Sequence, residues 1–129
     1  MSAEATMKNL GIELPNPPTP MGSYVGAKRM GGLVYISGQG PRNPDGSSIT
    51  GKVGTDGMSI EGAQAAARKV GLNALATLRA EIGDLDQVKQ IVKVCDETYC
   101  GNVGVEFMHI LGPDEKAWIQ ERMESKRNH

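Results

Sequence analysis

The stretch between Ser59 and Gly83 most constrains how this chain folds, because its apolar residues recur at steps of three and four. This period places them on one face of an α-helix roughly 33 Å long at 1.5 Å per residue. Ser59 is a typical N-cap, Glu61 lies in the first turn, and Gly83 follows the last apolar residue. The sequence therefore predicts one long helix that covers a sheet, with an inward face made of Ile60, Ala63, Ala67, Val70, Ala74, Leu78 and Ile82.

Two strands are predicted before this helix and one after it. Leu33 to Ser37 is rich in β-branched and aromatic residues and is bounded by glycines, which is typical of a strand. Asn43-Pro-Asp-Gly46 has turn chemistry, so Ile49 to Val53 is expected to return as the second strand of a hairpin. Val88 to Val94 is predicted to be a buried strand with its lysines directed toward solvent. The order predicts an α+β fold in which a helix lies on one face of a mixed sheet.

The two ends of the chain differ from this central part. Residues 13 to 20 contain four of the seven prolines and exclude a helix or a central strand, so residues 1–20 are interpreted as an extended N-terminal arm. At 129 residues the chain is expected to form a single domain, 1–129, with 95–129 as an atypical C-terminal segment. Within that segment, residues 113–127 begin with Pro and acids and end with bases, as a surface helix does.

The composition argues against several classes of partner and cofactor. A net charge of -1 leaves no excess of positive charge for a phosphate backbone, so no nucleic-acid partner is expected. No apolar run approaches the ~20 residues that cross a bilayer, and no secretory signal is visible. A cytoplasmic location without a membrane partner is therefore expected. Gly46 to Lys52 has the spacing of a phosphate-binding loop, but Val53 replaces the Ser or Thr that holds magnesium, and no cofactor is expected.

The two cysteines, Cys95 and Cys100, are too few for a disulfide framework and fit a reducing compartment. Asp96, Glu97 and His109 lie nearby in the sequence, so a metal site is conceivable. Structural zinc sites, however, more often use cysteine pairs two to four residues apart with two further ligands. Free thiols and no metal are predicted.

A candidate ligand site is expected where the strand from Leu33 ends. Ser37, Gly38 and Gln39 place a hydroxyl, a glycine and a carboxamide directly after a rigid element, and Pro41 then stops the strand. Polar groups in such a position are suited to hold a small polar ligand.

A series of separate motifs supports this interpretation. They are the Pro-rich arm, Tyr24, Ser37-Gly-Gln39, Gly51-Lys-Val-Gly54, the helix from Ser59, and Gly83-Asp-Leu-Asp86 before Val88. In this order they resemble the Rid family (YjgF, also called endoribonuclease L-PSP), small trimeric proteins that hydrolyse reactive enamines and imines. The resemblance runs from about Leu10 to Val94, roughly two thirds of the chain.

This resemblance implies a YjgF/chorismate-mutase-like fold, a homotrimer, and a pocket enclosed by two subunits. It assigns substrate binding to Tyr24, Ser37, Gly38 and Gln39. Such polar groups would shape the pocket around a small-molecule substrate.

The resemblance stops where the family carries its charged residues. In Rid enzymes an Arg beyond the helix pairs with the substrate carboxylate through a two-pronged bond, whereas here no Arg occurs between Arg79 and Arg122. Glu106, in a segment that echoes the family's last strands, would take the acidic catalytic position.

The implied activity is the hydrolysis of 2-imino and enamine acids to 2-keto acids and ammonia, which makes the chain a hydrolase. Lys28, Arg29 or a neighbouring subunit would have to supply the missing carboxylate anchor. The alternative is a catalytically impaired protein that keeps the scaffold for small-molecule binding or assembly. The ribonuclease named in the family label would need a basic stripe or paired histidines, which the body of the chain lacks.

Overall fold

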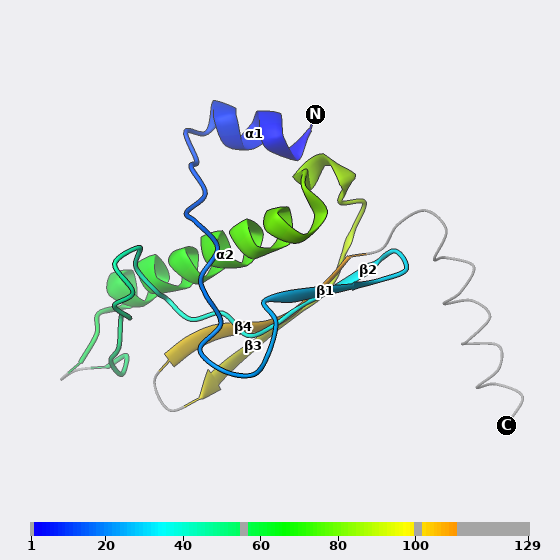
Figure 1. Ribbon diagram of the computed structural model, residues 1–129. Helices are drawn as coiled ribbons and strands as arrows, with labels where there is room; N and C mark the ends of the chain where they lie inside the picture. Colours follow the sequence, from blue (N-terminus) through cyan, green and yellow to red (C-terminus); the bar gives the residue numbers. More distant parts are fainter. Residues whose placement is uncertain (1, 55–56, 100–101, 111–129) are drawn as a thin grey trace, which may run out of the picture.

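The computed structural model describes the backbone of residues 2–54, 57–99 and 102–110 and the side chains of the described residues as far as Val94. Figure 1 shows a long helix lying across two β-hairpins, with a short helix packed beyond its C-terminal end. In chain order the elements are α1 (Ala3–Asn9), β1 (Ala27–Met30), β2 (Leu33–Ile36), α2 (Ile60–Ile82), the short 3-10 helix η1 (Leu85–Gln87), β3 (Ile91–Tyr99) and β4 (Asn102–Ile110). The chain therefore has an α+β fold.

Helix α2 confirms the long helix predicted between Ser59 and Gly83. The Ser59 hydroxyl accepts a hydrogen bond from the Gly62 amide at 3.0 Å, which satisfies one of the first free N–H groups of the helix. At the other end, Gly83 has a φ of 87° and donates its N–H to the Arg79 carbonyl. A side chain is strained at such a φ, so the glycine sets where the helix stops.

The buried face of α2 differs from the predicted one over its first two turns. Val70, Ala74 and Leu78 are buried as expected, but Ile60 is 66% exposed and Ala66, not Ala67, is covered. The first turns lie beside the loop that precedes the helix (Figure 1), where fewer strand residues reach them. The apolar period is real, but the side chains of the predicted face are buried only from Val70 onward.

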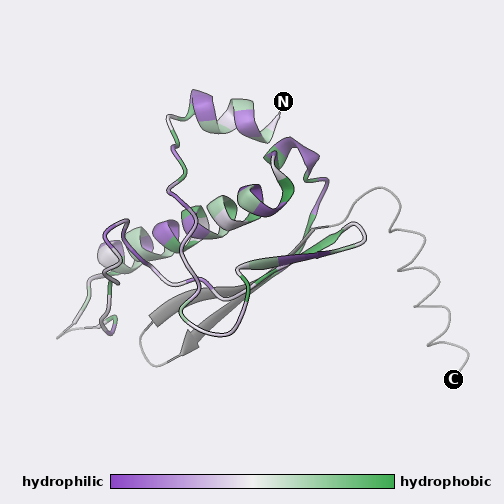
Figure 2. Cartoon of the chain, viewed as in Figure 1, coloured by the Kyte–Doolittle hydropathy of each residue, from purple (hydrophilic) through white to green (hydrophobic). Residues whose placement is uncertain are grey.

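The first hairpin forms with a different partner from the predicted one. β2 pairs antiparallel with β1, from Ala27↔Ile36 to Met30↔Leu33, whereas Ile49 to Val53 forms no strand and contributes an isolated bridge between Val53 and Met58. The reason is the Gly31-Gly32 turn, because Gly31 takes a φ of 61° that permits a two-residue connection. Figure 2 shows that β2 is largely hydrophobic while β1 carries a hydrophilic stretch.

The turn at Asn43 to Gly46 is confirmed. The Gly46 N–H donates to the Asn43 carbonyl at 3.0 Å, and Gly46 has a φ of 87°. The Ser47 hydroxyl donates to Asp45 Oδ1 at 2.6 Å. This bond, together with one from the Ser47 N–H, lowers the pKa of the Asp45 carboxyl by stabilising its charged form.

The second hairpin corrects the strand predicted at Val88 to Val94. β3 begins only at Ile91, extends to Tyr99 and pairs antiparallel with β4, from Ile91↔Ile110 to Tyr99↔Asn102. Ile91, Val92 and Val94 are exposed rather than buried, because α2 contacts β1, β2 and β4. Both strand pairs in the described part of the chain are antiparallel. The mixed sheet predicted from the sequence is therefore not seen among these strands.

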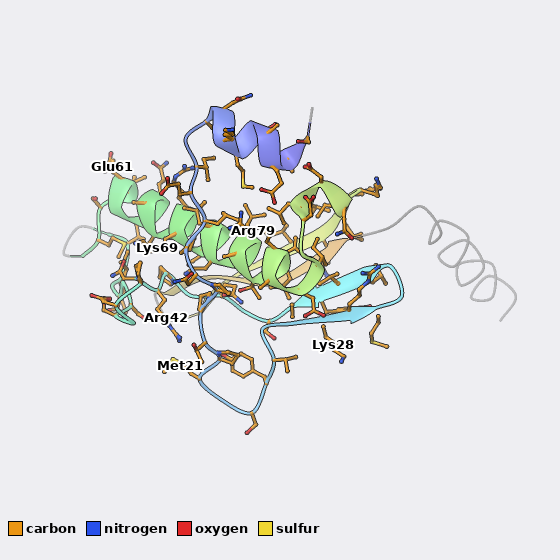
Figure 3. All side chains as sticks on the ribbon, turned by 45° about the horizontal axis from the view of Figure 1, so that its top comes forward. Met21, Lys28, Arg42, Glu61, Lys69 and Arg79 are labelled. Atoms are coloured by element: carbon orange, nitrogen blue, oxygen red, sulfur yellow. The ribbon has the colours of Figure 1, made fainter. Side chains whose placement is uncertain are left out.

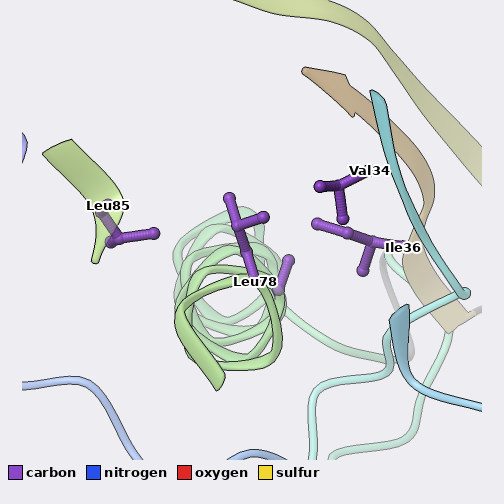
Figure 4. Packing of buried hydrophobic residues seen from close by; sticks show 5 residues of the cluster. Val34, Ile36, Leu78 and Leu85 are labelled. Atoms are coloured by element: carbon purple, nitrogen blue, oxygen red, sulfur yellow. The ribbon is translucent and has the colours of Figure 1, made fainter. Parts of the chain in front are cut away.

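The hydrophobic core lies between α2 and β2. Val34 and Ile36 on β2 face Leu78 on α2, with Ala74 beside it and Leu85 closing the far side (Figure 4). Burial of these side chains supplies most of the local driving force, at about 1.5 to 3 kcal/mol for each large aliphatic side chain.

The N-terminal arm holds a helix that the sequence analysis missed. α1 covers Ala3–Asn9, with Ser2 as its N-cap. Glu4 ties it to the rest of the chain, because its Oε1 accepts the Leu85 N–H at 3.2 Å and its Oε2 lies 3.6 Å from Arg79 Nη1. Residues 13–20, by contrast, contain no helix or strand, as their prolines predict.

Some predictions fall outside the described residues. They concern the surface helix at 113–127 and the side chains of Cys95, Cys100, Glu106 and His109. Among the described helices, none is long and apolar enough to cross a membrane.

We expect Leu78→Ala to lower the free energy of unfolding by about 2 to 5 kcal/mol, because Leu78 is 1% exposed and its removal leaves a cavity. Arg79→Ala should cost less than about 1 kcal/mol, since its ion pair with Glu4 is partly exposed. Urea unfolding followed by circular dichroism measures both. Equal losses would contradict the assigned packing face.

A second prediction concerns Asn73, which is 2% exposed on the same helix. Its Nδ2 donates to the carbonyls of Gly40 and Arg42 at 3.1 and 3.2 Å, so Asn73→Ala should cost about 1 to 3 kcal/mol by leaving buried polar groups unpaired. Gln64→Ala removes an exposed amide from α2 and is the matched control, with an expected change within about 0.5 kcal/mol. Similar melts for both variants would show that Asn73 does not hold this loop.

Candidate functional site

The segment that follows β2 is fixed to the segment that precedes β1. The Ser37 N–H donates to the Gly26 carbonyl at 2.9 Å, and the Ser37 hydroxyl donates to the Val25 carbonyl at 2.5 Å. Ser37 was predicted to bind substrate. In the structure its hydroxyl hydrogen is used to hold two loops together, and its side chain does not line the cavity formed by its neighbours.

The residues after Ser37 are held against α2. Gln39 is 8% exposed, and its Nε2 donates to the Ser37 carbonyl at 3.1 Å. The two bonds from Asn73 then secure the carbonyls of Gly40 and Arg42. This loop is therefore preorganised by a strand on one side and by a buried helix side chain on the other.

Tyr24, Gly38 and Gln39 line one small cavity of about 30 Å³. The rest of its wall is formed by the Pro-rich segment Pro18 to Pro20 and by Gly26, Gly40 and Arg42. The structure thus brings together three of the four predicted substrate-binding residues. The volume suits one water molecule or one small polar group.

Tyr24 lines this cavity and is also open to solvent. Its side chain is 49% exposed, and its hydroxyl accepts a hydrogen bond from the Met21 N–H at 3.3 Å. A phenolic hydroxyl that accepts one bond still has a proton to donate. Tyr24 is therefore available to a ligand both as an aromatic surface and as a donor.

Arg42 is a candidate site residue that the sequence analysis missed, because it lines the same cavity as Tyr24 and Gly38. It follows Pro41 directly, is half-buried, and its Nη1 donates to the Thr19 carbonyl at 3.0 Å. Figure 3 shows Arg42 between Lys69 of α2 and Met21 of the loop before β1. The sequence signal for Arg42 was its position three residues after the Ser37-Gly-Gln39 motif. Nothing in the neighbouring sequence, however, shows that its side chain lines the same cavity as Gly38.

The two other cations considered as anchors lie elsewhere. Lys28 lines a neighbouring groove of about 500 Å³, together with Glu81 and Thr77. Arg29 is exposed at the tip of the first hairpin, where its Nε donates to the Gly31 carbonyl at 3.1 Å. Neither of them lines the cavity of Tyr24 and Gly38.

The cavity is polar but has no acid among the described residues that line it. Glu106, the predicted catalytic acid, lies in β4 opposite the irregularity between Cys95 and Asp96, and its side chain is outside the described residues. No group of three metal-ligating side chains occurs in residues 2–54 and 57–94. Within this range the site offers an aromatic hydroxyl, a buried carboxamide and a guanidinium.

The comparisons with known sequences give partial matches. No family model matches the chain. Protein TCP17 of Trypanosoma cruzi is 40% identical over 90 residues, which cover 70% of this chain and 56% of that protein, so the chain spans little more than half of that relative. The E1 component of 2-oxoglutarate dehydrogenase from Brucella anthropi is 60% identical over 37 residues, or 29% of this chain and 4% of that protein.

Two solved structures share the fold. One, provisionally described as an endoribonuclease from Shewanella oneidensis MR-1, is 30% identical with a TM-score of 0.65 and covers 73% of this chain and 62% of its own. The other, Atu1372 of Agrobacterium tumefaciens, a protein of unknown function, is 22% identical with a TM-score of 0.66 and covers 84% and 92%. These likenesses support the Rid (YjgF) fold that the sequence motifs predicted.

Proposed function

We propose that this chain hydrolyses small reactive 2-imino acids to 2-keto acids and ammonia, as a member of the Rid family. The observation that carries the proposal is the shared cavity, because Tyr24 from the loop before β1 meets Gly38 and Gln39 from the loop after β2 there. The fold of the Shewanella and Agrobacterium structures supports it. The motifs and the geometry thus point to the same residues.

The proposed reaction asks little of the protein. Water adds to the C=N carbon of the protonated imine, R–C(=NH2+)–COO−, and the resulting aminoalcohol loses ammonia to leave R–CO–COO− and NH4+. The imine carbon is already electrophilic, so positioning and one proton transfer are enough to accelerate the step. The Tyr24 hydroxyl is a candidate donor to the leaving nitrogen, and the Gln39 carboxamide helps to keep the loop in place.

A small-molecule-binding protein without catalysis is the second candidate. It is favoured by one observation, namely that no acidic side chain lines the cavity among the described residues. The ribonuclease description of the Shewanella protein is not carried over to this chain. A net charge of -1 gives no overall excess of positive charge for RNA, and the two histidines, His109 and His129, lie far along the sequence from the cavity residues.

The activity is tested by generating a 2-imino acid in situ with an amino acid oxidase and trapping what remains as its semicarbazone. We expect the chain to remove the imine faster than buffer alone and to release equimolar ammonia. Tyr24→Phe should lower the rate roughly two- to tenfold, the value of one hydrogen bond in the transition state. Arg68→Ala, an exposed change on α2, is the control. If the wild type does not hydrolyse the imine faster than buffer, the proposed activity is rejected and the binding role is retained.

We also propose that the chain self-associates, as the family resemblance implies. Met30 on β1 and Ile91, Val92 and Val94 on β3 are exposed in the single chain. Exposed apolar strand residues and unpaired strand edges are commonly covered by a further subunit. A second copy would bury them and enlarge the small cavity into a pocket.

Sedimentation velocity at micromolar concentration should therefore show an oligomer, with a trimer as the expected state. Val92→Glu should shift the distribution toward monomer, because a charge in a buried interface is costly. Lys89→Glu changes an exposed residue before β3 and should leave the distribution unchanged. A wild-type monomer across this range would rule out self-association.

A further inference from the structure

Arg42 occupies a junction between cavities. It lines the 30 Å³ cavity with Tyr24 and Gly38, and it also lines two adjoining cavities of about 300 Å³ each. One of these is bounded by the Pro-rich segment and Asn73, and the other also reaches Lys69. Its side chain therefore faces open space on several sides while remaining half-buried.

The charge of Arg42 is not paired in the described part of the chain. There its guanidinium donates to the neutral Thr19 carbonyl at 3.0 Å, and the ion pair among the described residues joins Arg79 to Glu4. A guanidinium has five N–H donors in a planar fork that matches a carboxylate. A half-buried cation with most of its donors unused favours binding of an anion.

The backbone of Arg42 is held firmly. Asn73 donates to its carbonyl at 3.2 Å, and the Arg42 N–H donates to the Gly40 carbonyl at 2.8 Å. Pro41 is buried and its carbonyl accepts the Ile49 N–H. The base of the side chain is thus fixed from both sides, and the Thr19 contact holds one nitrogen of the head group. Binding of a carboxylate would therefore cost little further conformational entropy of the Arg42 side chain.

We propose that Arg42 binds the carboxylate of the substrate, and that the chain consequently selects 2-imino acids over neutral imines. This rests on the proposed function for the reaction, but the anion-binding role also stands by itself. The guanidinium that the family resemblance leads one to expect beyond α2 is thereby replaced by one that enters from the loop after β2. The room for the rest of the substrate lies in the two adjoining cavities of about 300 Å³, both of which Arg42 also lines.

Binding is measured directly with 2-oxobutyrate, a stable 2-keto acid, and with its neutral amide, by isothermal titration calorimetry on the full chain. The wild type should bind the acid about tenfold or more tightly than the amide. Arg42→Met keeps the length of the side chain and should remove that preference. Arg68→Met, on the exposed side of α2, should preserve it. Thermal melts check that each variant is folded.

Three results would overturn the inference: no binding of 2-oxobutyrate by the wild type, equal binding of acid and amide, or unchanged affinity in folded Arg42→Met. The imine assay keeps the two proposals separate. Wild-type activity with an unchanged KM in Arg42→Met would reject the anchor and retain the reaction. Binding that depends on Arg42, without hydrolysis by any variant, would retain the anchor and reject the reaction.

Discussion

The packing of α2 against β2 is the contact on which the rest of the described structure depends. Leu78 and Ala74 meet Val34 and Ile36 across this interface. The same interface fixes where β2 ends, because Ile36 must face the helix for the core to close. The residues after Ile36 therefore leave the sheet at one defined place beside α2. The candidate site is a consequence of that exit point.

A single buried polar residue on this helix, Asn73, connects the core to the loop of the candidate site. Asn73 is buried between apolar neighbours, and its amide group is bonded to two carbonyls of the loop after β2. A buried amide is tolerated there because its donors are satisfied. Its hydrogen bonds join the helix to the backbone of Gly40 and Arg42. The packing of the helix in the core therefore also fixes the backbone position of the Arg42 cation. Thr77, one turn further along, is also buried, and its hydroxyl has no partner among the described residues.

The arrangement separates shape from charge. Tyr24, Gly38 and Gln39 supply surface and hydrogen bonds, and they come from loops anchored by Ser37. Arg42 supplies the positive charge and is positioned through α2. The two solved structures share the fold, and TCP17 is similar in sequence over 70% of this chain. The similarity of 37 residues to a 2-oxoglutarate dehydrogenase component covers 4% of that enzyme and transfers no activity.

The sequence by itself determined α2, its two caps, the strand at Leu33 and the turn at Asn43, because each depends on residues close together in the chain. It also named Tyr24, Gly38 and Gln39 through motifs whose meaning comes from a family resemblance. Tertiary structure decided the partner of β2 and the exposure of Ile60 and of Ile91, Val92 and Val94. These depend on which surfaces meet, which local propensity does not encode. Arg42 belongs to this second group, since the bonds from Asn73 and Thr19 that orient it join residues far apart in the sequence.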